Sequence, residues 1–238
     1  MTNPTLSLFA ILCLLLPVVG FIACNSADAA NISLPAAEQD APLASSPVEK
    51  TAVVAGGCFW GIQAVFQHVK GVTSAVSGYS GGAAETANYE RVCSGDTGHA
   101  ESVKVTYDAS KLTYGQLLRI FFSVAHDPTE MNRQGPDTGS QYRSAIFYVD
   151  EEQKRIANAY IAQLDKAHSF PQSIVTQVVP LKGFYPAEEY HQDYATTHPH
   201  QPYIMIYDTP KVTNLRRLFP DLYADQKENK SASSQASR

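Results

Sequence analysis

The segment Thr51–Val69, TAVVAGGCFWGIQAVFQHV, decides how the fold begins. Its first half is a short β-branched apolar run that ends at two glycines, which predicts a buried strand followed by a tight turn. From Phe59 onward, apolar residues recur at helical spacing, at positions 59, 62, 65, 66 and 69. A buried strand therefore passes directly into a helix, and Cys58 stands at the junction, at the helix N-terminus.

Strands and helices alternate along most of the remaining chain. Alternating or β-branched runs predict further strands within residues 71–82, 102–108, 145–149 and 174–180. Amphipathic spacing predicts helices over 113–125, with Thr113 as the cap, and over 150–167, and the stretch 187–199 is short and helical or turn-like. Two adjacent strands interrupt a pure strand–helix–strand repeat. The order predicts an α+β two-layer sandwich with helices packed on a mixed sheet.

The N-terminal region differs in composition from the rest of the chain. Leu6 to Cys24 is almost wholly apolar, and the stretch after it is rich in Ala, Ser and Pro. This pattern predicts a leader at 1–30, a disordered linker at 31–47, one domain at 48–223 and a disordered tail at 224–238. Small residues at 27–29 favour a soluble exported product, whereas FIAC, ending at Cys24, resembles a lipoprotein box.

Composition and charge narrow the function further. The net charge of −5 and the absence of a block of Lys and Arg argue against a nucleic-acid partner. We expect export to the bacterial periplasm or cell envelope, a possible membrane tether through the N-terminus, and a monomer. Of the four cysteines, Cys13 and Cys24 belong to the expected leader, which leaves Cys58 and Cys93 in the domain. An exported domain could pair these two as a disulfide.

Cys58 has the sequence surroundings of a nucleophile. A thiolate at a helix N-terminus is stabilised by free N–H groups and by the positive end of the helix dipole, which lowers the pKa of the thiol. Phe59 and Trp60 beside the sulfur could line an apolar pocket for a small group such as a methyl. The alternative is that Cys58 is a small buried hydrophobe and that Phe59 and Trp60 belong to the core.

The longer pattern resembles a known family. The motifs GCFWG, GYSGG, NYERVCSGDTGHAE, HDPTEMNRQGPDTGSQYRS and AEEYHQDY occur in this order and together resemble the type A peptide methionine sulfoxide reductases. The resemblance covers roughly residues 48–223. It implies a ferredoxin-like core, no metal and no cofactor. It also implies reduction of methionine S-sulfoxide, free or in oxidised proteins.

The resemblance also implies a role for each matching residue. Cys58 matches the nucleophile, and Phe59 and Trp60 match the pocket for the ε-methyl of the substrate. Glu101, at the end of GHAE, matches the acid that protonates the sulfoxide oxygen. Three further residues complete the set: Tyr89 and Tyr142 match the hydroxyls that hold that oxygen, and Asp137 matches a polar residue of the same site.

One departure bears on how the enzyme is recycled. Many relatives have resolving cysteines near the C-terminus, but no cysteine follows Cys93 here, as in the single-cysteine subgroup. The expected sulfenic acid on Cys58 would then need an external thiol, from a thioredoxin-like protein or a small molecule. Cys93 is expected to be buried and not catalytic.

Two other functions would use some of the same residues. A cysteine hydrolase would use Cys58 with a histidine base, and a redox sensor or binding module would use the same cysteine and aromatic residues without turnover. His191, His198 and His200 lack a metal-ligand spacing and are expected to be surface or loop histidines. His99 and His126 are expected to bond the backbone or shape loops.

Overall fold

The computed structural model describes residues 33–225, so the expected leader at 1–30 and most of the expected tail lie outside it. Within the described range, none of the helices has both the length and the apolarity that a membrane crossing requires. The strands are β1 Glu49–Ala55, β2 Val72–Ser80, β3 Ala100–Asp108, β4 Arg133–Gln134, β5 Asp137–Thr138, β6 Ala145–Tyr148, β7 Gln177–Pro180 and β8 Phe184–Pro186. The α-helices are α1 Phe59–Gln67, α2 Tyr89–Val92, α3 Tyr114–Ile120, α4 Glu151–Lys166, α5 Tyr194–Thr197 and α6 Thr209–Leu218. Shorter turns are η1 Ala84–Thr86, η3 Ser140–Tyr142 and η4 Glu189–His191, which are 3₁₀, and η2 Phe121–Ala125 and η5 Ile204–Asp208, which are π-helical.

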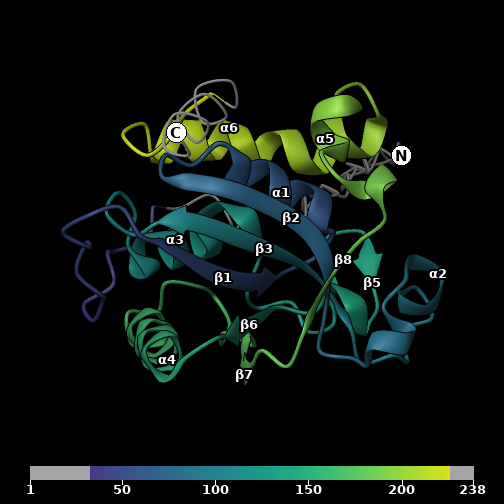
Figure 1. Cartoon of the computed structure of the whole chain (residues 1–238), viewed down its shortest axis with the longest axis horizontal. Coiled ribbons are helices and arrows are strands. Elements are labelled where there is room, and N and C mark those ends of the chain that lie inside the picture. Colours follow the sequence, from purple (N-terminus) through teal and green to yellow (C-terminus); the bar gives the residue numbers. More distant parts are fainter. Residues whose placement is uncertain (1–32, 226–238) are drawn as a thin grey trace, which may run out of the picture.

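Six strands form one mixed sheet in the order β7-β6-β1-β3-β2-β8. All neighbouring pairs are antiparallel except β6 and β7, which are parallel. In Figure 1, α1 and α6 lie side by side at the top of the view, and α4 lies near β6 and β7 at the bottom. Helices packed on a mixed sheet confirm the predicted α+β class.

The sheet is buried on both faces. Val54 of β1 and Val103 of β3 belong to the larger core, which also contains the apolar sides of α1 and α3. Val53 points to the other face and packs in a smaller cluster with Phe147. Because strand residues alternate between faces, Glu101 lies on the same face as Val103, toward α1.

The connection from β1 to α1 is the predicted tight turn. Gly57 has φ of +94°, a conformation that residues with a Cβ rarely adopt. The ring of His126 packs against Gly56 so closely that a Cβ there would lie 2.7 Å from the His126 Cγ. The two glycines therefore let the chain turn sharply and place Cys58 at the helix N-terminus, as the sequence predicts.

The predicted helix 113–125 is present, with a change of pitch near its end. Thr113 caps α3 in a capping box, because its side chain accepts from the backbone N–H of Gln116 and the Gln116 side chain accepts in return from the Thr113 N–H. The helix continues as the buried π-helical turn η2. That turn leads into His126, which packs under the β1–α1 connection.

The expectation of a disordered linker over residues 31–47 is wrong from residue 33 onward. Leu34 is buried in the main core, and the hydroxyl of Tyr160 donates to the carbonyl oxygen of Pro35 at 2.7 Å. Asp40 accepts from a backbone N–H in the first turn of α3 at 2.7 Å. Composition suggested disorder because the stretch has no aromatics, but one buried leucine and a few hydrogen bonds are enough to fix it to α3 and α4.

The domain also extends beyond the boundary expected at residue 223. Ala224 is buried, and its backbone N–H donates to the carbonyl oxygen of His68 at 2.8 Å. The domain therefore includes the first residue of the expected tail 224–238. Residues 126–144, between η2 and β6, contain the small β4–β5 hairpin and η3, which position two of the expected site residues.

Candidate active site

Cys58 and Glu101 meet at the N-terminus of α1. Cys58 directly precedes the helix and is 8% exposed. Glu101 comes from the start of β3, and its Oε2 accepts from the backbone N–H of Phe59 at 3.1 Å. The first N–H groups of a helix have no partner within the helix. One of these groups, the N–H of Phe59, therefore holds the Glu101 carboxyl at the helix end that Cys58 precedes.

Glu101 is a weak acid in this setting. Burial raises its pKa to about 8, the carboxyls of Asp137 and Asp208 add to the effect, and the hydrogen bond from Phe59 opposes it. An acid with this pKa is mostly protonated at neutral pH and can donate a proton or a hydrogen bond. The raised pKa agrees with the expectation for a carboxyl in an apolar pocket.

The pKa of Cys58 differs from the expectation. The N–H of Trp60 lowers it, as a helix N-terminus should, and Lys211 also lowers it. Burial raises the pKa more strongly, and Glu101 and Asp208 raise it further, so that the net shift is well above the ordinary value. The thiol of the free enzyme is therefore protonated, because loss of solvent and two nearby carboxyls outweigh the helix end.

The two aromatic residues after Cys58 occupy different surroundings. Phe59 is fully buried among Tyr79 and other core residues. Trp60 is half-buried and stacks on Tyr194 with a centroid distance of 3.9 Å, while Tyr203 meets it edge-on at 6.0 Å. The first residue anchors α1 in the core, and the second forms an aromatic wall that solvent can reach.

The two expected hydroxyls and Asp137 lie around the same helix end. The pKa of Tyr89 is raised by burial, by a side-chain hydrogen bond with Cys93 and by the charges of Glu101 and Cys58. The pKa of Tyr142 is raised by burial and by the charges of Glu101, Asp137 and Cys58. Glu101 therefore acts electrostatically on both hydroxyls, and the Tyr203 hydroxyl, whose ring meets Trp60 edge-on, bonds Asp137. The structure thus brings all seven expected residues together.

The remaining expectations for cysteine and histidine have mixed outcomes. Cys93 is exposed, not buried, and both domain cysteines are free thiols. His126 bonds the carbonyl oxygen of Phe121 and the hydroxyl of Ser144, and His99 bonds loop backbone, as expected. His191 is 2% exposed, so it is not a surface histidine, because the aromatic side chains around η4 cover it.

Asp208 and Lys211 are site residues that sequence reasoning missed. Asp208, at the end of η5, is 1% exposed, and its Oδ1 accepts from the Lys211 Nζ at 3.1 Å. A Cβ added at Gly61 would lie 2.1 Å from that Oδ1, so the pair packs directly on the first turn of α1. Burial raises the pKa of Asp208, and Lys211 opposes the shift. The only signal in the sequence is a charged pair at i, i+3 spacing beyond the expected helices.

Two further residues hold the walls of the site. Tyr203 donates its hydroxyl to Asp137, which joins the C-terminal segment to the β4–β5 hairpin. Glu188 accepts from the backbone N–H of Tyr89 at 2.9 Å and from the hydroxyl of Tyr79 at 2.8 Å. Burial raises the pKa of Glu188, but these hydrogen bonds outweigh it and the net shift is downward. Glu188 is therefore ionised, and its two hydrogen bonds connect β2 to α2.

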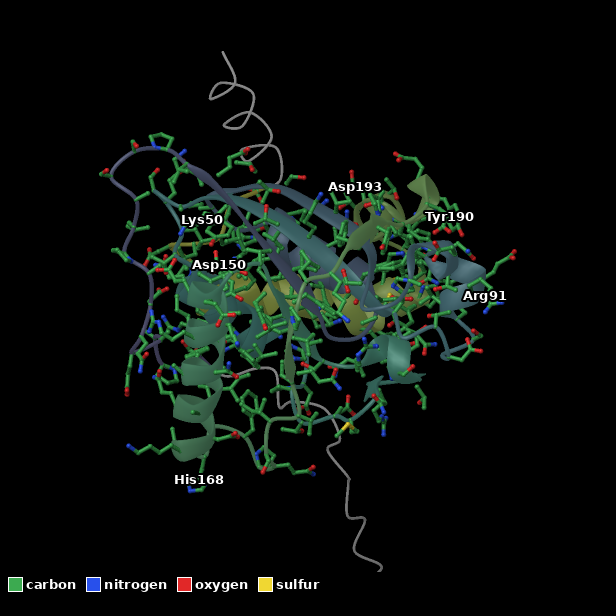
Figure 2. The ribbon with its side chains drawn as sticks, turned by 60° about the horizontal axis from the view of Figure 1, so that its bottom comes forward. Lys50, Arg91, Asp150, His168, Tyr190 and Asp193 are labelled. Carbon is green, nitrogen blue, oxygen red and sulfur yellow. The ribbon has the colours of Figure 1, made fainter. Side chains whose placement is uncertain are left out.

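Figure 2 shows where η4 and α2 lie in the whole domain. In Figure 2, Tyr190 of η4 and Arg91 of α2 lie at the same end of the molecule, and Asp193 lies on the same side of the view as Tyr190. The hydrogen bond from the Tyr89 backbone to Glu188 joins these two segments directly. The η4 turn and α2 therefore flank the helix end that carries Cys58.

Comparison with known proteins places the chain in a family. A family model described as peptide methionine sulfoxide reductase matches residues 50–222. The peptide methionine sulfoxide reductase MsrA 2 of Mesorhizobium japonicum is 60% identical over 182 residues, which cover 76% of this chain and 93% of that relative. The chain belongs to the type A peptide methionine sulfoxide reductases. The MsrA 2 protein of Synechocystis is 53% identical over 170 residues, 71% of this chain and 79% of its own length.

Solved structures of this family have a similar fold. Reduced Mxr1 from Saccharomyces cerevisiae is 31% identical, has a TM-score of 0.56 and covers 69% of this chain and 92% of its own. Methionine sulfoxide reductase A of Corynebacterium diphtheriae is 33% identical, with a TM-score of 0.56 and coverage of 67% and 80%. As a family member, the chain is a peptide-methionine (S)-S-oxide reductase whose reaction depends on a cysteine thiol. The hydrolase interpretation is therefore set aside.

Proposed function

We propose that Cys58 is the nucleophile of this reductase and that Glu101 is its general acid. The observation that carries the proposal is the end of α1, where Cys58 directly precedes the helix and the N–H of Phe59 bonds Glu101. Both groups are protonated at neutral pH, since burial raises the pKa of each. The site therefore holds a nucleophile and a proton donor in fixed relation.

The reductive step uses both groups. Glu101 donates its proton to the sulfoxide oxygen, which turns a poor electrophile into one that sulfur can attack. The Cys58 sulfur, whose proton passes to the Glu101 carboxylate, takes the oxygen from the substrate. The products are methionine and a sulfenic acid on Cys58, so that cysteine is oxidised by two electrons and the sulfoxide is reduced by two.

The substrate is held by the side chains around this helix end. Phe59 and Trp60 form the apolar pocket for the ε-methyl group, and the stack of Trp60 on Tyr194 makes that wall rigid. Tyr89 and Tyr142 donate hydrogen bonds to the sulfoxide oxygen. Their pKa values are raised, so both hydroxyls keep their protons and remain donors at neutral pH. Asp137, bonded by Tyr203, completes the polar side of the pocket.

An external thiol returns the enzyme to its reduced state. A first thiol attacks the sulfenic acid, which releases water and forms a mixed disulfide with Cys58, and a second thiol then releases Cys58 and leaves as a disulfide. The shortage of cysteines supports this route, since Cys93 is the only other cysteine among residues 33–225. The reductant is a thioredoxin-like protein or a small thiol, and the substrates are oxidised proteins or free methionine sulfoxide, so that the enzyme repairs proteins under oxidative stress.

The proposal is tested with the two sulfoxide epimers. Peptides that carry methionine S-sulfoxide or R-sulfoxide are incubated separately with the enzyme and dithiothreitol, and methionine is quantified. We expect turnover of the S epimer and none of the R epimer above background. Equal turnover of both epimers, or reduction of neither, would reject the assignment of the site.

Two finer points of architecture and location are part of the proposal. A ferredoxin-like core is supported by the order β6-β1-β3-β2, with α1 and α3 as the crossovers. Action outside the cytoplasm is supported by the apolar run from Leu6 to Cys24, and we propose that the enzyme acts as a monomer. Fractionation of cells that express the wild type or Cys24→Ala tests the second point, because only a lipid-anchored form would leave the membrane fraction when Cys24 is lost.

A further inference from the structure

His191 lies at the centre of the aromatic side chains behind the pocket, although no role is yet assigned to it. Its ring centroid is 5.1 Å from Phe59 in an edge-on arrangement, 5.9 Å from Trp60 and 4.5 Å from Tyr89. It is 2% exposed and comes from η4, far along the chain from these partners. One side chain therefore supports both proposed walls of the methyl pocket.

The hydrogen bond between Trp60 and His191 fixes the state of the imidazole. The Trp60 Nε1 lies 3.3 Å from the His191 Nδ1, and an indole N–H can only donate. The His191 Nδ1 must therefore accept, which requires a neutral ring with its proton on Nε2. That Nε2 is buried without a hydrogen-bond partner among the described residues, and the Glu188 Oε2 is 4.0 Å away.

We propose that neutral His191 is a positioning residue, which orients Trp60 by accepting its indole N–H and thereby sets the shape of the methyl pocket. The inference rests on the proposed function, in which Phe59 and Trp60 line that pocket. The imidazole does not touch the reacting atoms. Its effect is on substrate affinity, through the orientation of Trp60.

The surroundings of His191 keep the ring neutral near pH 7. Burial lowers its pKa, and Glu188 on the same turn opposes the shift. The other titratable groups that face it are the hydroxyls of Tyr89 from α2 and Tyr190 from η4, and beyond Phe59 lie Cys58 and Glu101. Protonation would place an N–H on Nδ1 opposite the N–H of Trp60. Two donors cannot bond each other, so acid pH would release the indole.

His126 shows that this arrangement is not general for a buried histidine. Its pKa is lowered to about 3 by burial, but one ring nitrogen bonds the carbonyl oxygen of Phe121 at 3.2 Å and the other bonds the hydroxyl of Ser144 at 2.7 Å. Both nitrogens of His126 have partners in the fixed core. His191 instead uses one nitrogen for the half-buried Trp60.

The test uses the full chain and the fact that Trp60 is its only tryptophan. The intrinsic fluorescence is titrated from pH 8 to pH 4 in the wild type, in His191→Asn and in His191→Leu. The side-chain oxygen of Asn can accept the indole N–H where the His191 Nδ1 did, but Asn does not titrate, and Leu cannot accept. We expect a fluorescence transition below about pH 6.5 in the wild type, where a histidine with a lowered pKa titrates, and none in His191→Asn.

Kinetics separate positioning from mere space filling. We expect His191→Leu to raise the KM for the S-sulfoxide peptide about tenfold, since a buried donor loses its partner, with kcat within about threefold. His191→Asn should restore KM to near the wild-type value. Equal KM values in all three proteins, or equal rises in both variants, would overturn the proposal, as would a transition that persists in His191→Asn. If the enzyme reduced no sulfoxide at all, the proposed function would fail, but the fluorescence titration would still decide the bond.

Discussion

The two cysteines of the domain sit at opposite kinds of helix end. Cys58 directly precedes α1 and is nearly buried, and the backbone N–H of Trp60 lowers the pKa of its thiol. Cys93 directly follows α2, where unpaired carbonyl groups gather, and it is exposed. The pKa of each thiol is raised, by burial and nearby carboxyls at Cys58, and at Cys93 by partial burial that outweighs the hydrogen bond of Tyr89.

This difference shows that exposure alone does not mark the reactive cysteine. The exposed thiol of Cys93 interacts with the Tyr89 hydroxyl, and Glu101 and Glu188 raise its pKa, but Cys93 does not stand at the helix N-terminus whose N–H holds Glu101. Buried Cys58 has Glu101, whose pKa of about 8 makes it a donor at neutral pH, bonded to the same helix end. Reactivity toward a sulfoxide therefore follows from the neighbouring acid and the pocket, and the comparison can be tested at each of these parts.

The largest expected effect separates the two thiols directly. Cys58→Ser should abolish sulfoxide reduction, because a serine hydroxyl cannot accept the oxygen from the substrate. Cys93→Ser should keep more than about half of the wild-type rate, since partial burial and one hydrogen bond to Tyr89 give Cys93 no catalytic role. Steady-state turnover of an S-sulfoxide peptide with dithiothreitol measures both. A Cys93→Ser enzyme that stops after one turnover with Cys58 oxidised would make Cys93 the resolving residue.

The next effect concerns the acid beside Cys58. Glu101→Gln keeps a hydrogen-bond donor but removes the proton, so the reductive step should slow by about 10²-fold or more. Single-turnover kinetics without recycling isolate this step. In the wild type, the rate should fall as pH rises through about 8, because the protonated form of Glu101 is lost there.

Thermal unfolding at different pH values provides a second, independent test of the substitution Glu101→Gln. The folded-state pKa of Glu101 lies above its ordinary value of 4.5, so its contribution to folding is full below that value and is lost as pH rises to about 8. Glu101→Gln should therefore unfold at a higher temperature than the wild type at pH 9 and gain less at pH 4. A variant with wild-type single-turnover kinetics at every pH would remove Glu101 from the role of acid.

A smaller effect tests whether the two thiols communicate. After one equivalent of S-sulfoxide without reductant, we expect loss of one thiol, labelling of Cys58 by dimedone and no internal disulfide. The reason is that the two thiols stand at the ends of different helices, α1 and α2, and both are free. Mass spectrometry of the oxidised enzyme decides the point: a Cys58–Cys93 disulfide in high yield, without a dimedone adduct, would contradict the single-cysteine mechanism.

The smallest expected effect concerns the pair of Asp208 and Lys211, which changes the pKa of the Cys58 thiol. Lys211 lowers the pKa of the Cys58 thiol and Asp208 raises it. Lys211→Met should slow alkylation of Cys58 by iodoacetamide about two- to tenfold at neutral pH, because less thiolate is present, and Asp208→Asn should accelerate it by a similar factor. Rates that change in the same direction in both variants would show that the pair acts through packing on α1 and not through charge.

Much of the chemistry could be predicted from local sequence. The two glycines and the helical spacing after them placed Cys58 at a helix N-terminus, because turn conformations and helix periodicity depend on near neighbours. The motif GHAE indicated an acid directly before the strand predicted over 102–108, whereas the structure places Glu101 within β3. The direction of the Cys58 pKa could not be predicted, because the carboxyls that raise it come from β3 and η5, far along the chain.

Short polar or small-residue regions were the least predictable. Residues 33–47 have no sequence signal for order, and contacts with distant segments fix them: Leu34 with η2, Asp40 with α3 and Pro35 with α4. The same is true of α6, which has one buried residue, Leu215, and polar residues around most of its surface. Short polar segments depend on partners that sequence neighbours do not reveal.

By itself, the sequence determined the α+β class, the strand-to-helix junction that carries Cys58 and the set of residue types that a sulfoxide reductase needs. Only the tertiary structure decided that Glu101 bonds the first turn of α1, that Asp208 and Lys211 lie beneath it, and that His191 faces Trp60. The physical reason is that the two kinds of effect act over different distances along the sequence. Backbone conformation follows mainly from adjacent residues, whereas burial and charge, which set the protonation of a site, come from whichever segments the fold packs together.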